Sequence, residues 1–278
     1  MNDFNCSKKF SNWLEIKKWK LFDYQKEFFS CLSKNKYKQY IISSDTGTGK
    51  TITSFLPFLN YFCKGIKKNL LYISPLKSIN SNLEENLKKI IFELNIQCKV
   101  EKRTSDVPSN KKKKQLFSIP DFLLTTPESF ALMIANPDAL NFLENIDYVI
   151  IDEITELLND KRGDQLSLSL SKLNSINKKF VLIGLSATVS NFKNLNEWIS
   201  FKGKTKLISN KKKKKIKIDV LYSKKIPLVG HSPNFAIDII KRKIINKKTI
   251  IFVNTRSQSE LLHNELLESL NSYTKVNI

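Results

Sequence analysis

The sequence predicts an α/β protein, in which a twisted, mostly parallel sheet is flanked by helices and ligands bind at the carboxyl ends of the strands. Nearly continuous apolar runs, such as LLYIS at 70–74 and YVIID at 148–152, are typical of strands buried on both faces of a parallel sheet. Segments of helix length separate these runs. Such alternation implies right-handed crossovers, which place helices on both faces of the sheet.

The first domain is expected to span residues 1–210 and to contain five strands. Helix-like segments between the strands include Lys50–Phe62 and Leu76–Leu94. A linker is expected at 211–234, where the pattern of the first domain ends. The predicted strands are Gln39–Ser43, Leu70–Ser74, Phe122–Thr125, Tyr148–Asp152 and Lys179–Gly184.

A second, shorter unit is expected at residues 235–278. Its pattern predicts a helix at Ala236–Ile245, a strand at Thr249–Val253 and a helix at Ser257–Leu270. One strand with two helices is too little for an independent α/β domain. We therefore expect the truncated start of another domain, with apolar surface exposed at 250–253.

Composition indicates a globular protein with an anionic partner. The 278 residues include 47 Lys and Arg against 26 Asp and Glu, a formal net charge of +21. Such a charge attracts polyanions, so nucleic acid is the expected partner and an anionic membrane surface is the second candidate. We attribute roughly half of the basicity to the Lys, Asn and Ile bias of an AT-rich genome. The lysine runs at 111–114 and 211–215 are interpreted as solvated loops, and a strand candidate follows the second run at 216–222.

The cysteines are widely spaced and form no C-x-x-C pair, so neither a zinc site nor a disulfide framework is expected. This pattern fits a reducing, cytoplasmic location. No apolar run resembles a signal peptide, and none reaches the length of about 18 residues that a membrane helix needs, so no transmembrane helix is expected. Nucleic acid, and no membrane, is the expected partner.

The segment SDTGTGKT at 44–51 follows a predicted strand and opens a predicted helix. In that context the pattern predicts a phosphate site, because glycines let backbone N–H groups wrap a phosphate at the positive end of a helix. Lys50 is expected to reach the β- and γ-phosphates of a nucleotide, and Thr51 to ligate Mg²⁺. Ser44 stands where the strict pattern has glycine. The residues expected to bind the nucleotide here are Thr46, Gly47, Thr48, Gly49, Lys50 and Thr51.

A magnesium-bound phosphate needs a carboxylate at the end of a neighbouring buried strand. Asp152 and Glu153 follow the run YVII. We expect Asp152 to hold Mg²⁺ and Glu153 to orient or deprotonate the attacking water, so these two residues and Lys50 are the predicted catalytic residues. The next predicted strand ends in LSAT, whose Ser186 and Thr188 are small hydroxyl residues able to bridge the site to a neighbouring domain.

The motifs GTGKT, DEIT and SAT together resemble those of superfamily 2 helicases of the DEAD/DEAH-box type. The sequence around these motifs is most similar to the large helicase-related (Lhr-type) family. The segments that carry this resemblance are LYISPLKSIN, RTSDVPS, FLLTTPESFALM, VIIDEITELLNDKRGDQLSLSLSKL, IGLSATVSNFKNLNEWI and TIIFVNTRSQSELL. These segments follow the order of the family over roughly residues 20–270. The resemblance implies a RecA-like P-loop NTPase domain, the truncated start of a second RecA-like domain, and ATP with Mg²⁺ as cofactors.

The resemblance also implies further roles. Gln25 corresponds to the glutamine that reads adenine, and Ser186 with Thr188 to the motif that couples hydrolysis to strand movement. Small hydroxyls and backbone N–H groups suit nucleic-acid backbones, since they contact phosphate and sugar without reading sequence, in DNA or RNA. The implied nucleic-acid contacts are Ser74, Pro75, Lys77, Thr125, Thr126, Pro127, Glu128, Asn254, Thr255 and Arg256.

Two departures from the family pattern qualify these expectations. Thr155 stands where the family usually has histidine, so coupling is expected to weaken while Mg²⁺ binding survives. The later arginines of the second domain are absent from these residues. Such an arginine contributes ~10³–10⁵ in rate, so we expect this chain alone to bind ATP but to hydrolyse it poorly unless a second polypeptide completes the second domain.

Three hypotheses for function therefore stay open. The first is an ATP-dependent nucleic-acid helicase or translocase, favoured by Lys50, Asp152 and Glu153. The second is a non-catalytic module that binds nucleotide and nucleic acid, favoured by Thr155 and the high charge. The third is the remnant of a broken gene.

Overall fold

The computed structural model describes residues 6–45, 47–158, 160–187, 192–199, 203–210, 217–222, 236–245 and 247–269. The chain divides into two compact units, Met1–Lys213 and Lys214–Ile278. No helix within these described ranges is both long enough and apolar enough to cross a membrane.

The first unit is built on one parallel sheet of seven strands in the order β3-β4-β2-β5-β6-β1-β7. The predicted α/β class and all five predicted strands are confirmed. The structure adds β3 and β7, which lie at the two edges of the sheet. The strands are β1 Gln39–Ser43, β2 Leu70–Ile73, β3 Val100–Arg103, β4 Phe122–Thr125, β5 Tyr148–Ile151, β6 Val181–Ser186 and β7 Thr205–Ser209.

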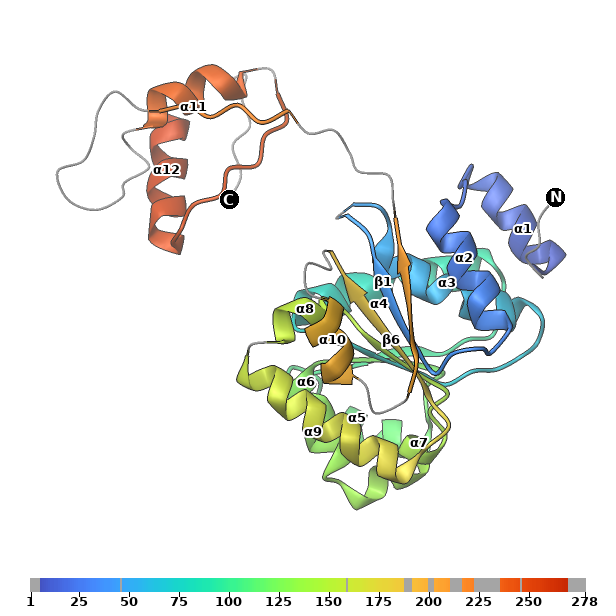
Figure 1. The fold of residues 1–278 in the computed structure, drawn as a ribbon. Helices are drawn as coiled ribbons and strands as arrows, with labels where there is room; N and C mark the ends of the chain where they lie inside the picture. Colours follow the sequence, from blue (N-terminus) through green and yellow to red (C-terminus); the bar gives the residue numbers. More distant parts are fainter. Residues whose placement is uncertain are drawn as a thin grey trace. The chain divides into compact units, whose positions relative to one another are not determined.

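Helices cover both faces of the sheet (Figure 1). On one face lie α1 Lys8–Ile16, α2 Asp23–Ser33, α3 Lys50–Cys63 and α4 Lys77–Glu93. On the other lie α5 Ser109–Phe117, α6 Pro127–Ile134, the 3₁₀ turn Pro137–Ala139, α7 Leu140–Glu144, α8 Ile154–Leu157, α9 Lys161–Ile176 and α10 Phe192–Ile199. Because the strands are parallel, their carboxyl ends meet at one edge of the sheet, which is where the predicted site residues fall.

The continuous apolar runs are explained by two cores, one on each face of the sheet. Along β5, Tyr148 and Ile150 point into the core beneath α1–α4, whereas Val149 and Ile151 point into the core beneath α6–α9. All four side chains are buried, so every position of the strand must be apolar.

The lysine run at 111–114 does not form a loop. It lies on α5, so that interpretation is wrong. Lys, Gln and Leu all favour helices, and the buried Leu116 anchors α5 in the core of its face. The run at 211–215 lies outside the described residues.

The second unit contains α11 Ile237–Ile244 and α12 Arg256–Ser269, which confirms the two predicted helices to within a residue at each end. The strands predicted at Thr249–Val253 and at 216–222 are absent from the described residues of these segments, because no neighbouring strand pairs with them. Exposure at 250–253 alternates: Ile250 and Phe252 are 81% and 89% exposed. Ile251 and Val253 instead pack on the small core that α11 and α12 share.

Candidate functional site

The loop between β1 and α3 contains two glycines whose backbone conformation other residues rarely adopt. Gly47 and Gly49 have φ values of +73° and +76°, a left-handed backbone that favours glycine. Thr48 donates its hydroxyl hydrogen bond to the Asp45 carbonyl at 2.6 Å and lies 2.9 Å from the Ser44 hydroxyl. The loop is thus braced from within at its first residue, where serine replaces the usual glycine. Thr46 lies outside the described residues.

Two side chains at the start of α3 meet the two carboxylates that follow β5. The ammonium of Lys50 lies 3.2 Å from the Glu153 carboxylate. The hydroxyl of Thr51 donates to the Asp152 carboxylate at 3.3 Å. About a hundred residues of sequence separate the partners, and β6 lies between their strands. The fold therefore brings together the residues that the two motifs place far apart.

The Asp152 carboxylate is 2% exposed and is held by hydrogen bonds on both oxygens. The Tyr72 hydroxyl of β2 donates to Oδ2, and the Glu153 backbone N–H donates to Oδ1 at 2.9 Å. Burial raises the pKa of Asp152, and the hydrogen bond from Tyr72 opposes that rise. Burial also raises the pKa of Tyr72 well above its usual range, so Tyr72 stays protonated and acts as a donor.

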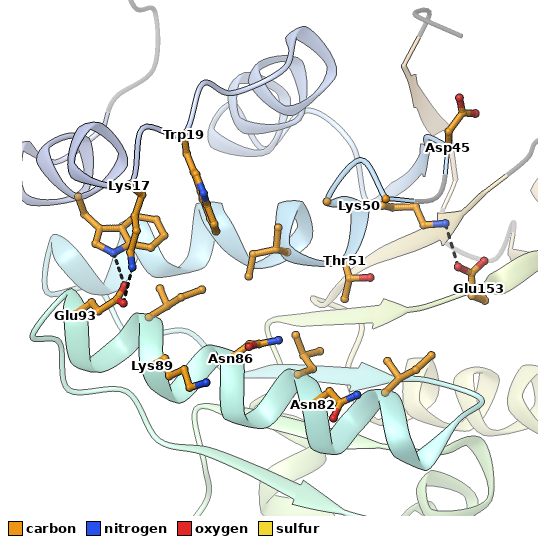
Figure 2. A pocket seen from close by; sticks show the side chains of 17 residues that line it. Lys17, Trp19, Asp45, Lys50, Thr51, Asn82, Asn86, Lys89, Glu93 and Glu153 are labelled. Atoms are coloured by element: carbon orange, nitrogen blue, oxygen red, sulfur yellow. Dashed lines mark hydrogen bonds and ion pairs between the residues drawn. The ribbon is translucent and has the colours of Figure 1, made fainter. Parts of the chain in front are cut away.

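Glu153 itself has a left-handed backbone with φ of +45°, which is uncommon for a residue with a Cβ. This conformation ends the strand and starts α8 at the next residue. It turns the Glu153 side chain toward Lys50 (Figure 2). A backbone of this kind is favoured only when its surroundings hold it, and such residues are enriched at functional sites.

Gln25 is buried at the start of α2 and already has partners. Its amide nitrogen donates to the Thr53 hydroxyl at 2.7 Å, and its amide oxygen accepts from the Phe22 backbone N–H at 2.8 Å. Gln25 therefore ties α2 to the first turn of α3, immediately beside Gly49. Its predicted contact with adenine stays a prediction.

A cavity of about 700 Å³ runs from Lys50 and Thr51 along the groove between α3 and α4 (Figure 2). Asn82 and Asn86 of α4 line its floor, and Trp19 lies above them. These residues were missed by sequence reasoning. They belong to no motif. The one sequence signal is the pair of tryptophans, Trp13 and Trp19, in the polar segment SNWLEIKKWK.

The far end of this cavity is fixed by Glu93 of α4. Its carboxylate accepts from the Trp13 indole at 2.9 Å and pairs with Lys17 at 2.6 Å. The hydrogen bonds from Lys17 and Trp13 lower the pKa of Glu93. The end of α1 is thereby held against α4.

Thr155, which replaces the usual histidine, reaches the predicted coupling motif. Its hydroxyl lies 3.0 Å from the Ser186 hydroxyl at the end of β6. A hydrogen bond thus links the turn after Asp152 to the LSAT strand without any titratable group. Thr188 lies outside the described residues.

The predicted nucleic-acid contacts of the first unit gather at the ends of β2 and β4, which are neighbours in the sheet. The hydroxyl-bearing side chains of Ser74, Thr125 and Thr126 are buried. Thr125 donates to the Arg103 carbonyl at 2.7 Å, so its hydroxyl braces the strand ends. Pro127 begins α6 and is buried too.

The exposed groups at this edge are Lys77 and Glu128, whose side chains face solvent. Arg162 of α9 pairs with Glu128 at 2.6 Å and donates to the Pro75 carbonyl at 2.8 Å. It therefore links the two predicted contact segments, although no sequence motif singled it out.

The three predicted contacts of the second unit lie at the start of α12 and are exposed. Thr255 caps the helix by accepting from the Gln258 N–H at 3.2 Å, and Arg256 pairs with Glu260 at 3.0 Å. Asn254 precedes them, and its backbone N–H donates to the Gln258 side chain at 3.2 Å.

Comparison with known proteins identifies the family. The model of the DEAD/DEAH box helicase family matches residues 22–198. The chain belongs to this family. It is 36% identical over 248 residues to the ATP-dependent helicase Lhr-Core of Methanocaldococcus jannaschii, and 34% identical over 241 residues to that of Saccharolobus solfataricus. These matches cover 80% and 79% of this chain but only 29% and 27% of the relatives. The Lhr-type resemblance is confirmed, and the chain spans under a third of those relatives' length.

Solved structures agree with the RecA-like helicase fold. The Mycobacterium smegmatis helicase Lhr bound to ssDNA and AMP-PNP superposes with a TM-score of 0.81 at 26% identity, covering 95% of this chain and 36% of that chain. Mss116p bound to ssRNA and AMP-PNP has a TM-score of 0.75 at 18% identity, covering 95% of this chain and 56% of that one. The second likeness concerns the fold alone.

Proposed function

We propose that this chain is the ATP-binding portion of an ATP-dependent nucleic-acid helicase or translocase. Residues 1–210 would form its first RecA-like domain, and residues 235–278 would begin the second after a linker at 211–234. The observation that carries the proposal is the meeting of Lys50, Thr51, Asp152 and Glu153 at the strand ends, beside a cavity of nucleotide size.

The donor set at this site fits Mg²⁺. Thr51 and Asp152 offer hard oxygen ligands that already face each other across 3.3 Å. No cluster of three His, Cys, Asp or Glu side chains that could hold a metal occurs among the described residues. A cation held by only two protein oxygens keeps room for water and phosphate, as Mg²⁺ prefers. When bound, Mg²⁺ would neutralise phosphate charge.

When a nucleotide binds, Lys50 and Glu153 would no longer pair with each other, and each would take a separate role. An incoming γ-phosphate would compete with Glu153 for the Lys50 ammonium, since both are anions within its reach. Release from Lys50 would leave the Glu153 carboxylate to accept a proton from, or orient, the attacking water. Burial raises the pKa of Asp152, and a bound cation would stabilise its charged carboxylate.

The nucleotide base would lie in the part of the cavity beneath Trp19, with Gln25 on the side of α2. An indole ring provides a flat apolar surface on which a base can stack. Asn82 and Asn86 supply amides that can hydrogen-bond to ribose or base edges from the opposite wall.

A single strand of DNA or RNA would cross the ends of β2 and β4. The buried hydroxyls of Ser74, Thr125 and Thr126 would hold the protein backbone in place at these strand ends. Backbone N–H groups and the exposed Lys77 would then contact phosphates without reading base sequence. The Thr155–Ser186 hydrogen bond would couple this edge to the nucleotide. A cytoplasmic location is part of the proposal, supported by the free state of all four cysteines.

The test is ATP turnover by the 278-residue chain, with and without single-stranded DNA or RNA. Lys50→Ala should abolish turnover and binding, whereas Glu153→Gln should abolish turnover but keep Mg²⁺-dependent nucleotide binding. Nucleotide and nucleic-acid binding without any turnover in the unchanged chain would instead favour a non-catalytic binding module. Turnover that survives both substitutions would refute the assignment of this site.

A further inference from the structure

The lysine run at 111–114 lies on α5 beside a groove that the proposed function leaves unassigned. A groove of about 430 Å³ runs along this helix. The residues of α5 that line it stand at positions 109, 112, 113, 116 and 117, the spacing of one face of a helix. Asn136 and Asp138, which follow α6, form part of the opposite wall. The groove is therefore a surface feature of one helix face.

Three cations, Arg103, Lys112 and Lys113, line this groove together with one carboxylate, Asp138. Residues 99–117 contain seven Lys and Arg against two Asp and Glu. The two carboxylates pair with Lys99 and Lys102, and none of the four run lysines forms an ion pair within the described residues. Lys111, Lys113 and Lys114 are exposed. Cations that follow one helix without forming an ion pair are complementary to a polyanion.

An aromatic side chain lies at the far end of the groove. Phe117, the last residue of α5, is 84% exposed and lines the groove together with Lys113. Its neighbour Leu116 is buried, so α5 does not need Phe117 for packing. Lysines combined with an exposed ring form the pattern by which proteins hold single strands, with phosphates on cations and a base stacked on the ring.

At Arg103, the groove adjoins the carboxyl ends of the strands, where the nucleic-acid contacts are predicted. Thr125, a predicted nucleic-acid contact, donates to the Arg103 carbonyl at 2.7 Å. The Arg103 guanidinium lines the groove and donates to the Lys112 carbonyl at 2.6 Å. Lys77 and Lys112 both reach Ser105 in the turn between β3 and α5. A strand that leaves the ends of β2 and β4 would thus pass the end of β3 and enter the groove.

We propose that the α5 groove continues the nucleic-acid path, with the lysines of the run binding phosphates and Phe117 stacking on a base. The inference rests on the proposed binding of nucleic acid at the strand ends. The groove follows an α-helix of nine residues, about 13 Å in length. It therefore extends the path by a short stretch of single strand and adds no recognition of sequence.

The test compares two sets of four lysines changed to glutamine. In the α5 variant, Lys111, Lys112, Lys113 and Lys114 are replaced. In the control variant the replaced residues are Lys34, Lys36, Lys38 and Lys67. All four are exposed and precede β1 or β2, so they lie near the amino ends of the strands, away from the proposed path at the carboxyl ends. Both variants lose the same net charge, so only position differs. Fluorescence anisotropy would follow binding of oligo-dT and oligo-U over a range of salt concentrations.

The α5 variant should lose roughly 5-fold in affinity at 0.1 M salt for each phosphate contact removed, and its salt slope should fall by about 0.7 for each. The loss should be found with long strands and should vanish with strands of ~5 nucleotides, which fit at the strand ends alone. Phe117→Ala should weaken binding of long strands by roughly 5- to 100-fold with little change in salt slope. With long strands, the control variant should lose less affinity than the α5 variant.

Circular dichroism and the melting temperature check that each variant folds. Equal losses in the two lysine variants would overturn the inference while leaving binding at the strand ends intact. The same conclusion follows if Phe117→Ala has no effect and strands carrying 5-iodouracil fail to crosslink to the peptide that contains Phe117. If the unchanged chain binds no single strand of any length, both this inference and the proposed nucleic-acid function are refuted.

Discussion

Replacing Tyr72 with phenylalanine removes the hydrogen bond that Tyr72 donates to the proposed metal ligand. Tyr72 is fully buried in β2 and donates to Asp152. Phenylalanine keeps the ring and lacks only the hydroxyl, so the apolar packing of the ring is preserved. A hydrogen bond to a charged group contributes about 1.5–3 kcal/mol, and the carboxylate left short of a donor stays buried. We expect Tyr72→Phe to lower the free energy of unfolding by about that amount at neutral pH.

The effect should depend on pH, and its sign follows from the pKa of Asp152. Burial already raises that pKa, and the Tyr72 hydrogen bond opposes the rise, so its loss raises the pKa further. A raised pKa in the folded state means that stability is lost as the pH rises through it. The deficit of the variant should therefore be largest above the raised pKa and should shrink as acid protonates Asp152 in both proteins.

Tyr40→Phe is the matched control. Tyr40 is equally buried in β1 but donates to the neutral Cys31 carbonyl at 3.0 Å. Its loss should lower the free energy of unfolding by about 0.5–1.5 kcal/mol at every pH, because no carboxylate is involved. Urea denaturation of both variants between pH 5 and pH 8 measures the difference. Equal, pH-independent deficits in the two variants would show that Tyr72 does not stabilise a charged Asp152.

Other substitutions test other parts of the account. Gly163→Ala should lower the free energy of unfolding by about 2–4 kcal/mol in urea denaturation, because a Cβ there would lie 1.7 Å from the Leu157 carbonyl oxygen; an unchanged midpoint would contradict the packing of α8 on α9. Thr155→Val should leave Mg²⁺-nucleotide affinity within about twofold but weaken the stimulation of turnover by nucleic acid, since it removes the hydroxyl bonded to Ser186. Thr155→Ser should restore stimulation, and a valine variant that is stimulated normally would remove this link from the coupling path.

The sequence predicted the central strands because they are buried on both faces, but it missed the two edges of the sheet. β3 has the sequence VEKR and β7 the sequence TKLIS, and several of their side chains are only half-buried. Polar residues are tolerated at an edge, so the apolar signal fades there. In the second unit the opposite error occurred. An apolar run that resembles a strand, TIIFV, pairs with no strand within the described residues, and two of its side chains, Ile251 and Val253, pack against the core of α11 and α12.

In the candidate site, too, some residues were predictable from the sequence and others were not. Lys50, Thr51, Asp152 and Glu153 were predictable because each belongs to a motif whose flanking strand and helix give its position. Trp19 and Asn86 were not, because they line the cavity only through the packing of α1 and α4, and no local pattern encodes that contact. Tyr72 was hidden for a related reason. In the sequence it is one apolar residue among several, and only the pairing of β2 with β5 places its hydroxyl at Asp152.

Binding of a nucleotide to the purified chain tests the central claim most directly. Isothermal titration with AMP-PNP would be done in Mg²⁺ and in EDTA, on the unchanged chain, on Lys50→Ala and on the exposed control Lys67→Ala. We predict binding with a stoichiometry of one that requires Mg²⁺, is abolished by Lys50→Ala and is unchanged by Lys67→Ala. Binding that is equally strong in EDTA, or that survives the loss of Lys50, would contradict the assignment of the β1–α3 loop and the end of β5 as the nucleotide site.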